Sequence, residues 1–149
     1  MKQTSVILAS TLSLLLSSFA FASDVIIDHP YARATPPNAP TSAVFLVLNN
    51  SDNVERSIVS ASTPAAGKVE LHTHVMDGDV MKMRQVDSIS IPAQGQTVLK
   101  PGGLHIMLFE LQQDFKEGGQ IDVTVNFANG ESQSFTAKIK KVMKGMMKH

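Results

Sequence analysis

The chain of 149 residues contains no cysteine. This absence excludes disulfide bonds, zinc–thiolate clusters, iron–sulfur centres and the blue-copper centre, which needs a cysteine thiolate. The stability of the folded chain must therefore come from the packing of its core.

The sequence also lacks sustained helical periodicity, internal repeats and a linker between two domains. Turn signals such as Gly118-Gly119 and Asn129-Gly130 recur at the spacing of short strands. After Met83 the apolar strand pattern continues through Val86 and on to Ile91. We therefore predict an all-β fold, an antiparallel Greek-key β-sandwich of roughly seven to nine strands.

The chain has no excess of one charge, because 13 basic and 13 acidic side chains balance. The distribution is uneven: four lysines lie in the last ten residues, and residues 23–139 hold 8 basic and 13 acidic groups. An acidic body argues against a nucleic-acid partner and suits a cation or a basic docking surface.

The N-terminal residues have the pattern of a secretory signal peptide. Lys2 precedes an apolar segment that is too short and too rich in serine for a membrane span, and Ala20-Phe21-Ala22 is a typical cleavage site. We predict a signal peptide at 1–22, cleavage after Ala22, and a periplasmic mature chain without a transmembrane segment. The sandwich domain is predicted at 23–139, followed by a flexible tail at 140–149 that is rich in Met, His and Lys.

Three pairs of potential metal ligands are each spaced two residues apart, so that each pair would lie on one side of a strand. They are His72 and His74, Met81 and Met83, and His105 and Met107. With Asp77-Gly78 as a two-residue hairpin loop, His74 lies opposite Met81 and His72 opposite Met83. Opposed residues have Cβ atoms about 5 Å apart, close enough to share one metal ion.

Methionine usually fills gaps in a hydrophobic core, but its distribution here is different. Apart from the initiator, the methionines lie only in the hairpin, beside His105 and in the tail: Met76, Met81, Met83, Met107, Met143, Met146 and Met147. Gap-filling residues would not avoid the core strands, so the pattern favours metal binding. Neutral, soft thioethers select Cu(I). Copper is the predicted metal.

The candidate ligands have a regular spacing. Ten residues separate His72 from Met83, twenty-one separate Met83 from His105, and His105-Ile106-Met107 is a His-x-Met. The surrounding motifs are Tyr31-Ala32-Arg33, Glu70-Leu71-His72, residues 77–84 and Pro101-Gly102-Gly103. This spacing and its surroundings resemble the periplasmic copper chaperones of the PCu(A)C family, and the resemblance covers nearly the whole predicted mature body.

The resemblance implies a cupredoxin-like sandwich that binds Cu(I) and delivers it to the Cu(A) centre of cytochrome c oxidase. The implied ligands are His72, Met83, His105 and Met107. His74 and Met81, on the same hairpin, are auxiliary candidates. The tail is similar to the Met- and His-rich extensions of some family members, which bind further copper; Cu(II) is a candidate ion for it, and the alternative is a solvated basic tail. Its candidate ligands are Met143, Met146, Met147 and His149.

Several alternative functions are compatible with this sequence. A copper buffer or resistance protein would have the same site without a dedicated acceptor. A copper enzyme or electron carrier is disfavoured, because there is no cysteine and no recognisable catalytic arrangement. A secreted sandwich used for adhesion would bind no stoichiometric copper. We expect a monomeric protein without enzymatic activity, whose partners are the copper ion and a Cu(A)-containing oxidase subunit or another copper-transfer protein.

Overall fold

The computed structural model describes residues 24–142, which form ten strands and no helix. The strands are β1 (Val25–Arg33), β2 (Thr41–Asn50), β3 (Arg56–Ser62), β4 (Ala66–Asp77), β5 (Val80–Gln85), β6 (Ile89–Ile91), β7 (Gln96–Leu99), β8 (His105–Leu111), β9 (Gln120–Phe127) and β10 (Ser132–Lys140). The predicted signal peptide, its cleavage site and tail residues 143–149 lie outside the described residues. Lys140, predicted to begin the tail, is the last residue of β10. Within 24–142, no segment forms a helix capable of crossing a bilayer.

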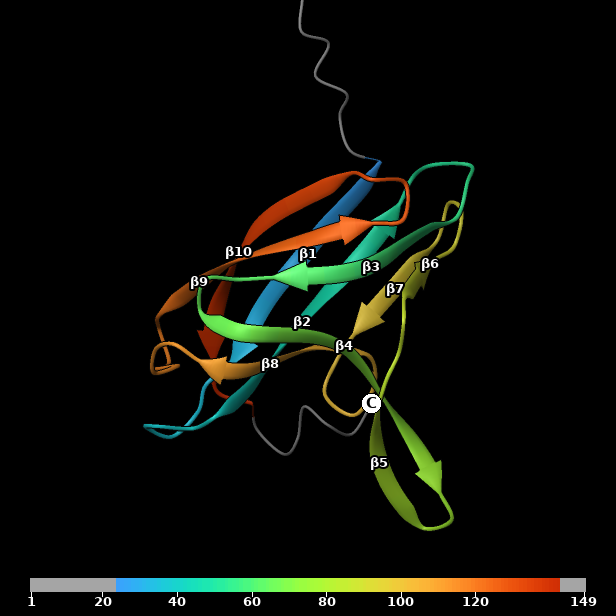
Figure 1. Ribbon diagram of the computed structural model, residues 1–149. Coiled ribbons are helices and arrows are strands. Elements are labelled where there is room, and N and C mark those ends of the chain that lie inside the picture. Colours follow the sequence, from blue (N-terminus) through green and yellow to red (C-terminus); the bar gives the residue numbers. More distant parts are fainter. Residues whose placement is uncertain (1–23, 143–149) are drawn as a thin grey trace, which may run out of the picture.

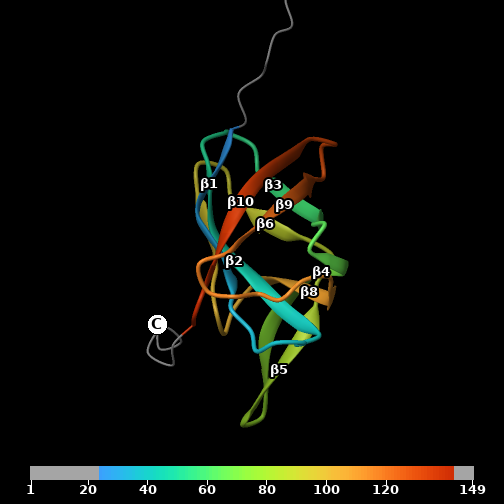
Figure 2. The ribbon, with the colours of Figure 1, turned by 90° about the vertical axis from the view of Figure 1, so that its left-hand side faces the viewer.

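All ten strands are connected by hydrogen bonds into one sheet, in the order β5-β4-β8-β2-β1-β10-β9-β3-β6, with β7 also pairing with β2 (Figure 1). The sheet folds over on itself, so that β1 lies to one side and β3 and β9 to the other (Figure 2). Every pair is antiparallel except β1 with β10. The predicted all-β sandwich is confirmed, with one parallel pair added.

The core lies between the two layers, and β8 shows how alternation along a strand builds it. Ile106 and Leu108 are completely buried in the core. His105 and Met107 point to the opposite face, as the two-residue period predicts. His105 is nevertheless only 2% exposed, because the turn at residues 101–103 lies beside it. The strand therefore holds the core with one face and presents two candidate ligands with the other.

The turn of the β4–β5 hairpin lies one residue later than the sequence predicts. Gly78 and Asp79 form the loop, and Asp77 pairs with Val80. Gly78 has a φ of +64°, which suits the first central position of a type II′ turn. The Asp-Gly dipeptide therefore straddles the end of β4 rather than forming the loop.

This turn corrects the predicted register of the hairpin. The pairs His74–Met81 and His72–Met83 are wrong: His74 lies opposite Met83, and His72 lies opposite Gln85. The physical reason is that the turn type sets which residues face each other. Each pairing moves by two residues, so the same side chains still share one face of the hairpin.

The segment after Met83 is not one continuous strand. Val86 donates a backbone hydrogen bond to the Leu71 carbonyl at 2.9 Å, and the chain then crosses to the other end of the strand order. There β6 pairs with β3. This division explains why the fold has ten strands rather than the seven to nine predicted.

Candidate metal centre

The candidate ligands lie on the outer face of β5, β4 and β8. Two registers bring distant parts of the sequence together: His72 lies directly opposite His105 on β8, and His74 lies directly opposite Met83 on β5. Because β4 pairs with both neighbours, the three ligand pairs predicted from the sequence lie on adjacent strands.

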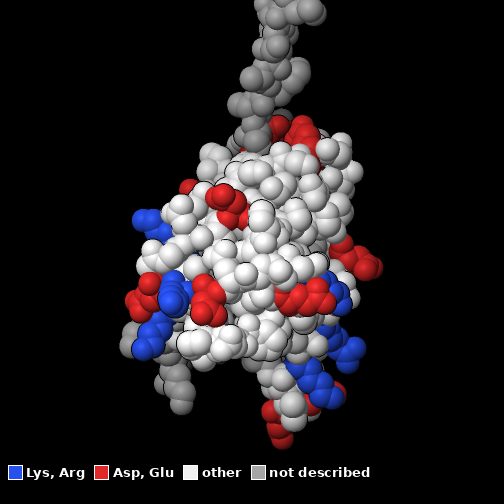
Figure 3. All heavy atoms as spheres, turned by 60° about the vertical axis from the view of Figure 1, so that its left-hand side comes forward, with Lys and Arg blue, Asp and Glu red and all other residues white. Residues whose placement is uncertain are grey.

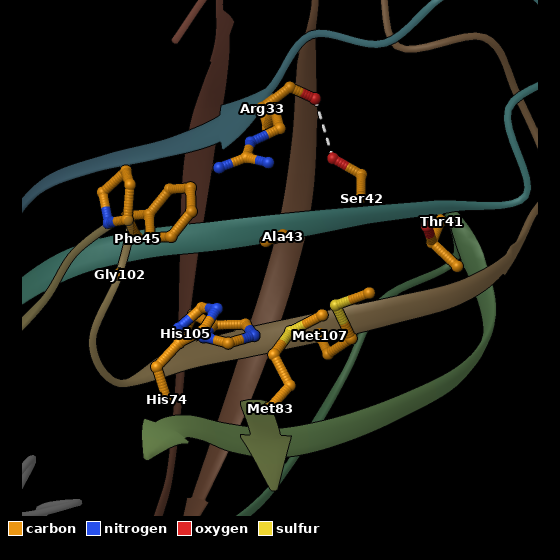
Figure 4. A pocket seen from close by; sticks show the side chains of 11 residues that line it. Arg33, Thr41, Ser42, Ala43, Phe45, His74, Met83, Gly102, His105 and Met107 are labelled. Carbon is orange, nitrogen blue, oxygen red and sulfur yellow. Dashed lines mark hydrogen bonds between the residues drawn. The ribbon is translucent and has the colours of Figure 1, made fainter. Parts of the chain in front are cut away.

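A cavity of about 160 Å³ opens on this face. Its lining contains two imidazoles and two thioethers, those of His74, His105, Met83 and Met107. Figure 4 shows the two rings beside each other and the two sulfur atoms next to them, all directed toward the same space. The remaining lining comes mainly from β2, Arg33 and the turn at Pro101. A small soft cation fits the size and donor chemistry of this space.

His72 lies beside the cavity rather than in its lining. Its ring centroid is 5.8 Å from that of His105, and its Nε2 donates a hydrogen bond of 2.7 Å to a carboxylate oxygen of Glu70. Its Nδ1 is buried and has no hydrogen-bond partner among the described residues. A buried nitrogen lone pair without a donor is costly unless it binds something, so Nδ1 is the atom that His72 offers to a ligand.

The carbonyl oxygen of Gly103 orients the other two rings. It lies 2.9 Å from Nδ1 of His105 and 3.3 Å from Nδ1 of His74. A carbonyl oxygen only accepts hydrogen bonds, so both Nδ1 atoms carry the proton and both Nε2 atoms keep a lone pair. Such outer contacts fix the tautomer and the direction of metal-binding histidines.

The cavity favours neutral imidazole. Burial lowers the pKa of His105 from its ordinary value of 6.5; His74, His72 and Arg33 add to this effect, and the hydrogen bond to Gly103 opposes it. Arg33 also lies in the wall, its guanidinium 5.7 Å from the centre of the Phe45 ring. As far as residues 24–142 form it, the lining contains no carboxylate, so every candidate donor atom in it is uncharged.

Sulfur is needed to complete a metal site here. Within residues 24–142, no three His, Asp or Glu side chains are grouped closely enough to hold a metal ion by themselves. Met81 lies outside the cavity, opposite Met76 near the end of the hairpin, and 56% of it is exposed. Met143, Met146, Met147 and His149 lie outside the described residues, and their copper binding stays a prediction.

Sequence reasoning did not assign a role to Arg33, Phe45 or the Gly103 carbonyl. The segments containing Arg33 and Gly103 stood out as parts of the resemblance. The sequence does not reveal the role of the Gly103 carbonyl, because a backbone carbonyl has no side-chain signal. It does not reveal the roles of Arg33 and Phe45, because β1 and β2 are far from the ligands in sequence. Only the pairing of β2 with β8 brings Ala43 opposite Met107 and closes the wall.

The lowered pKa of His105 predicts a pH dependence of stability. Between the folded-state pKa and 6.5, the unfolded chain binds the proton more readily than the folded chain does. The stability that neutral His105 contributes is therefore complete above about pH 6.5 and is lost as the pH falls through the folded-state pKa. Urea unfolding across this range should show a smaller pH slope for His105→Gln than for the parent chain. Equal slopes would contradict this assignment.

Glu70 is expected to select the tautomer of His72. Its carboxylate also accepts a hydrogen bond of 2.8 Å from Lys68, and the hydrogen bonds from Lys68 and His72 hold the pKa of Glu70 below its ordinary value. Glu70→Ala removes the acceptor, so the Nδ1–H tautomer of His72 should increase, as measured by ¹⁵N NMR of the imidazole. Glu70→Gln keeps an acceptor oxygen and should retain the parent tautomer. The same tautomer populations in both variants would show that Glu70 does not orient the ring.

Comparison with known proteins relates most of the chain to one family. A family model described as "Putative lipoprotein LpqE-like" matches residues 25–139. A protein of Leifsonia xyli subsp. xyli named "Putative lipoprotein Lxx21020" is 31% identical over 100 residues, covering 66% of this chain and 60% of its own. "Uncharacterized protein RP573" of Rickettsia prowazekii is 29% identical over 114 residues, covering 74% and 63%. The chain therefore spans about 60% of the length of these curated relatives.

Solved structures share the fold. Apo-DR1885 from Deinococcus radiodurans, determined in solution, has a TM-score of 0.65 and 26% identity, covering 97% of both chains. Its CuI-bound form has a TM-score of 0.63 and 29% identity, covering 80% of this chain and 81% of its own. The copper-bound PCuAC domain from PmoF2 has a TM-score of 0.70 at 18% identity, covering 82% and 97%. These likenesses confirm the cupredoxin-like sandwich.

Proposed function

The chain belongs to the LpqE-like family, and from the geometry of its cavity and its copper-bound structural neighbours we propose that it is a periplasmic copper chaperone. In this proposal it binds Cu(I) through His and Met side chains and delivers it to the Cu(A) site of cytochrome c oxidase. It is a binding and transfer protein rather than an enzyme. The copper-bound neighbours in the same fold support copper as the cargo.

One observation carries the proposal: imidazole and thioether groups from three strands meet at one small cavity that contains no carboxylate. A hard cation such as Ca²⁺ or Mg²⁺ requires oxygen ligands, and structural zinc sites are mostly built from thiolates and imidazoles. Two sulfur atoms beside two ring nitrogens instead match the preference of Cu(I). The convergence of these donors supports copper over the other metals.

We assign Met83, His105 and Met107 as three ligands of the primary site, whichever histidine supplies the fourth. The fourth position belongs to an imidazole of β4, for which His72 and His74 compete. The sequence spacing favours His72, whose buried Nδ1 is without a partner, while the lining of the cavity favours His74. His72→Asn and His74→Asn, titrated separately with Cu(I), identify the fourth ligand by the larger loss of affinity.

Neutral ligands suit a protein that must release its cargo. The ligands do not neutralise the charge of the bound Cu(I), and Arg33 adds a positive charge to the wall. An acceptor with cysteine thiolates gains a stronger electrostatic attraction for the ion. Met83 is half exposed, so an incoming ligand can reach the metal and displace the chaperone's donors one at a time, without a change in oxidation state.

The surface and the predicted targeting agree with a protein partner. Figure 3 shows acidic and basic groups interspersed on the face of the body that it draws, without a continuous basic patch among the described residues there. Such a surface suits orientation of a docking protein rather than binding of nucleic acid. Export by the signal peptide predicted at 1–22 would carry the chaperone to the periplasm, the compartment in which we propose that it meets its acceptor.

Metal transfer to an apo Cu(A) domain tests the proposal. The chain loaded with one equivalent of Cu(I) is mixed under anaerobic conditions with the apo domain, and copper in each separated protein is measured. We expect copper to move to the acceptor faster than from a small-molecule complex of the same affinity. Tight binding without transfer would instead identify a copper buffer, and no stoichiometric binding would reject copper altogether.

A further inference from the structure

The outer part of the β4–β5 hairpin projects from the body as a two-stranded ribbon. β8 pairs with β4 only as far as His72, and residues 73–77 pair with β5 alone. Figures 1 and 2 show this ribbon extending beyond the rest of the sandwich. The side chains of the ribbon therefore lie farther out from the body of the protein than the side chains that line the cavity.

Side chains on the ribbon are sorted by chemistry between its two faces. The face continuous with the cavity carries the pair His74–Met83 at the base and the pair Met76–Met81 farther out. On the opposite face Val75 pairs with Lys82. Lys82 also forms an ion pair with Asp77 on that face. All the soft donors of the ribbon thus lie on the side of the candidate metal site.

Packing does not explain the outer methionine pair. Met76 is 62% exposed and Met81 is 56% exposed, so neither fills a gap in a core, which is the usual role of methionine. The ribbon has no third strand over this pair, and an isolated two-stranded hairpin gains little stability from exposed thioethers. Metal binding explains two exposed, opposed thioether side chains better than packing does.

We propose that Met76 and Met81 form a second, outlying site for Cu(I), from which the ion passes to Met83 and His74 at the mouth of the cavity. This inference rests on the proposed copper-binding function. Directly opposed residues have Cβ atoms about 5 Å apart, and the flexible methionine side chain lets both sulfur atoms reach one ion. Successive pairs on one face of the ribbon are about 7 Å apart, a step that flexible thioethers can bridge.

The transfer is a ligand exchange. A sulfur atom of the Met83 side chain forms its bond to the ion as the Met76 or Met81 bond breaks, the ion remains Cu(I), and no proton is released. Two thioethers leave coordination positions open, so a donor protein or complex can remain attached while the ribbon takes the ion. The outer pair therefore acts as an entry site that binds Cu(I) weakly and exchanges it quickly.

Methyl NMR of the full chain tests this inference. Methionine methyl groups are labelled with ¹³C and assigned by single Leu substitutions, and Cu(I) is added under anaerobic conditions. We expect the Met83 and Met107 signals to shift with the first equivalent and the Met76 and Met81 signals to shift at higher Cu(I). Shifts at Met83 and Met107 without shifts at the outer pair would overturn this inference alone. If none of the four signals moved, the proposed function itself would fail.

Loading kinetics supply a matched control. Met76→Leu with Met81→Leu keeps the size of both side chains and should slow the loading of the cavity from a weak Cu(I) complex by about tenfold, since the local concentration of ion is lost. Adding Val75→Met and Lys82→Met restores two opposed sulfur atoms on the other face. We expect this fourfold variant to remain slow. Recovery of the parent rate, or no slowing by the leucine pair, would show that the arrangement on the cavity side is irrelevant.

Discussion

Replacing Met83 and His105 together by alanine is expected to lower the affinity for Cu(I) by more than about a hundredfold, because loss of a residue that merely orients a ligand already costs 10 to 100-fold. The two side chains come from β5 and β8 and supply one sulfur and one nitrogen to the cavity. Competition against a chelator of known Cu(I) affinity measures the loss.

The control removes one histidine and one exposed apolar side chain outside the cavity. His29 lies exposed at the register shift of β1, and Val59 on β3 is 44% exposed. The double variant His29→Ala, Val59→Ala should keep the parent affinity for the first equivalent of Cu(I). Met83→Ala alone guards against a folding artefact of the buried His105 position, since Met83 is half exposed. Equal affinities in the test and control variants would remove the cavity as the primary site.

Leu108→Ala is expected to give the largest loss of folding stability, about 2 to 5 kcal/mol. Leu108 is completely buried in the core, and its truncation removes apolar contacts and leaves a cavity between the two layers. Equilibrium unfolding in urea measures the change. Val98→Ala on β7, where the side chain is 42% exposed, should change the free energy of unfolding by less than about 0.5 kcal/mol.

The same variant separates folding from metal binding. Leu108 and Met107 are adjacent in β8 but face opposite sides of the strand. Below the unfolding transition, Leu108→Ala should therefore bind Cu(I) within about threefold of the parent chain, a change of less than 1 kcal/mol. A loss as large as that of the double ligand variant would mean that the cavity depends on the exact packing of the core.

The two-residue spacing of His105 and Met107 predicted correctly that both lie on one side of a strand, because side chains in a strand change sides at every residue. Ile106 and Leu108, which alternate with them along β8, lie in the core. The hairpin register was less predictable: Asp77-Gly78 signals a turn, but two adjacent loops are compatible with it. Only the pairing of Asp77 with Val80, which leaves Gly78 and Asp79 as the loop, decides that His74, rather than His72, faces Met83.

Long-range features could not be inferred from local patterns. Val86 belongs to the same apolar pattern as Ile89, yet the chain crosses there from one end of the strand order to the other. The parallel pairing of β1 with β10 joins segments from opposite ends of the domain. Such pairings are selected by the burial of the whole core, to which no single segment contributes a recognisable signal.

By itself, the amino-acid sequence determined that the protein is all-β and that it cannot use thiolates, and it predicted histidine and methionine at two-residue spacing as the candidate metal ligands. These conclusions depend on side-chain chemistry and on the period of a strand, which are local properties. The tertiary structure decided which donors meet: it closed the cavity with Arg33 and Phe45 from β1 and β2, turned His72 toward Glu70, and set two rings on the Gly103 carbonyl. Strand pairing and turn geometry place these groups within reach of one another, and neither is encoded in the spacing of the ligands.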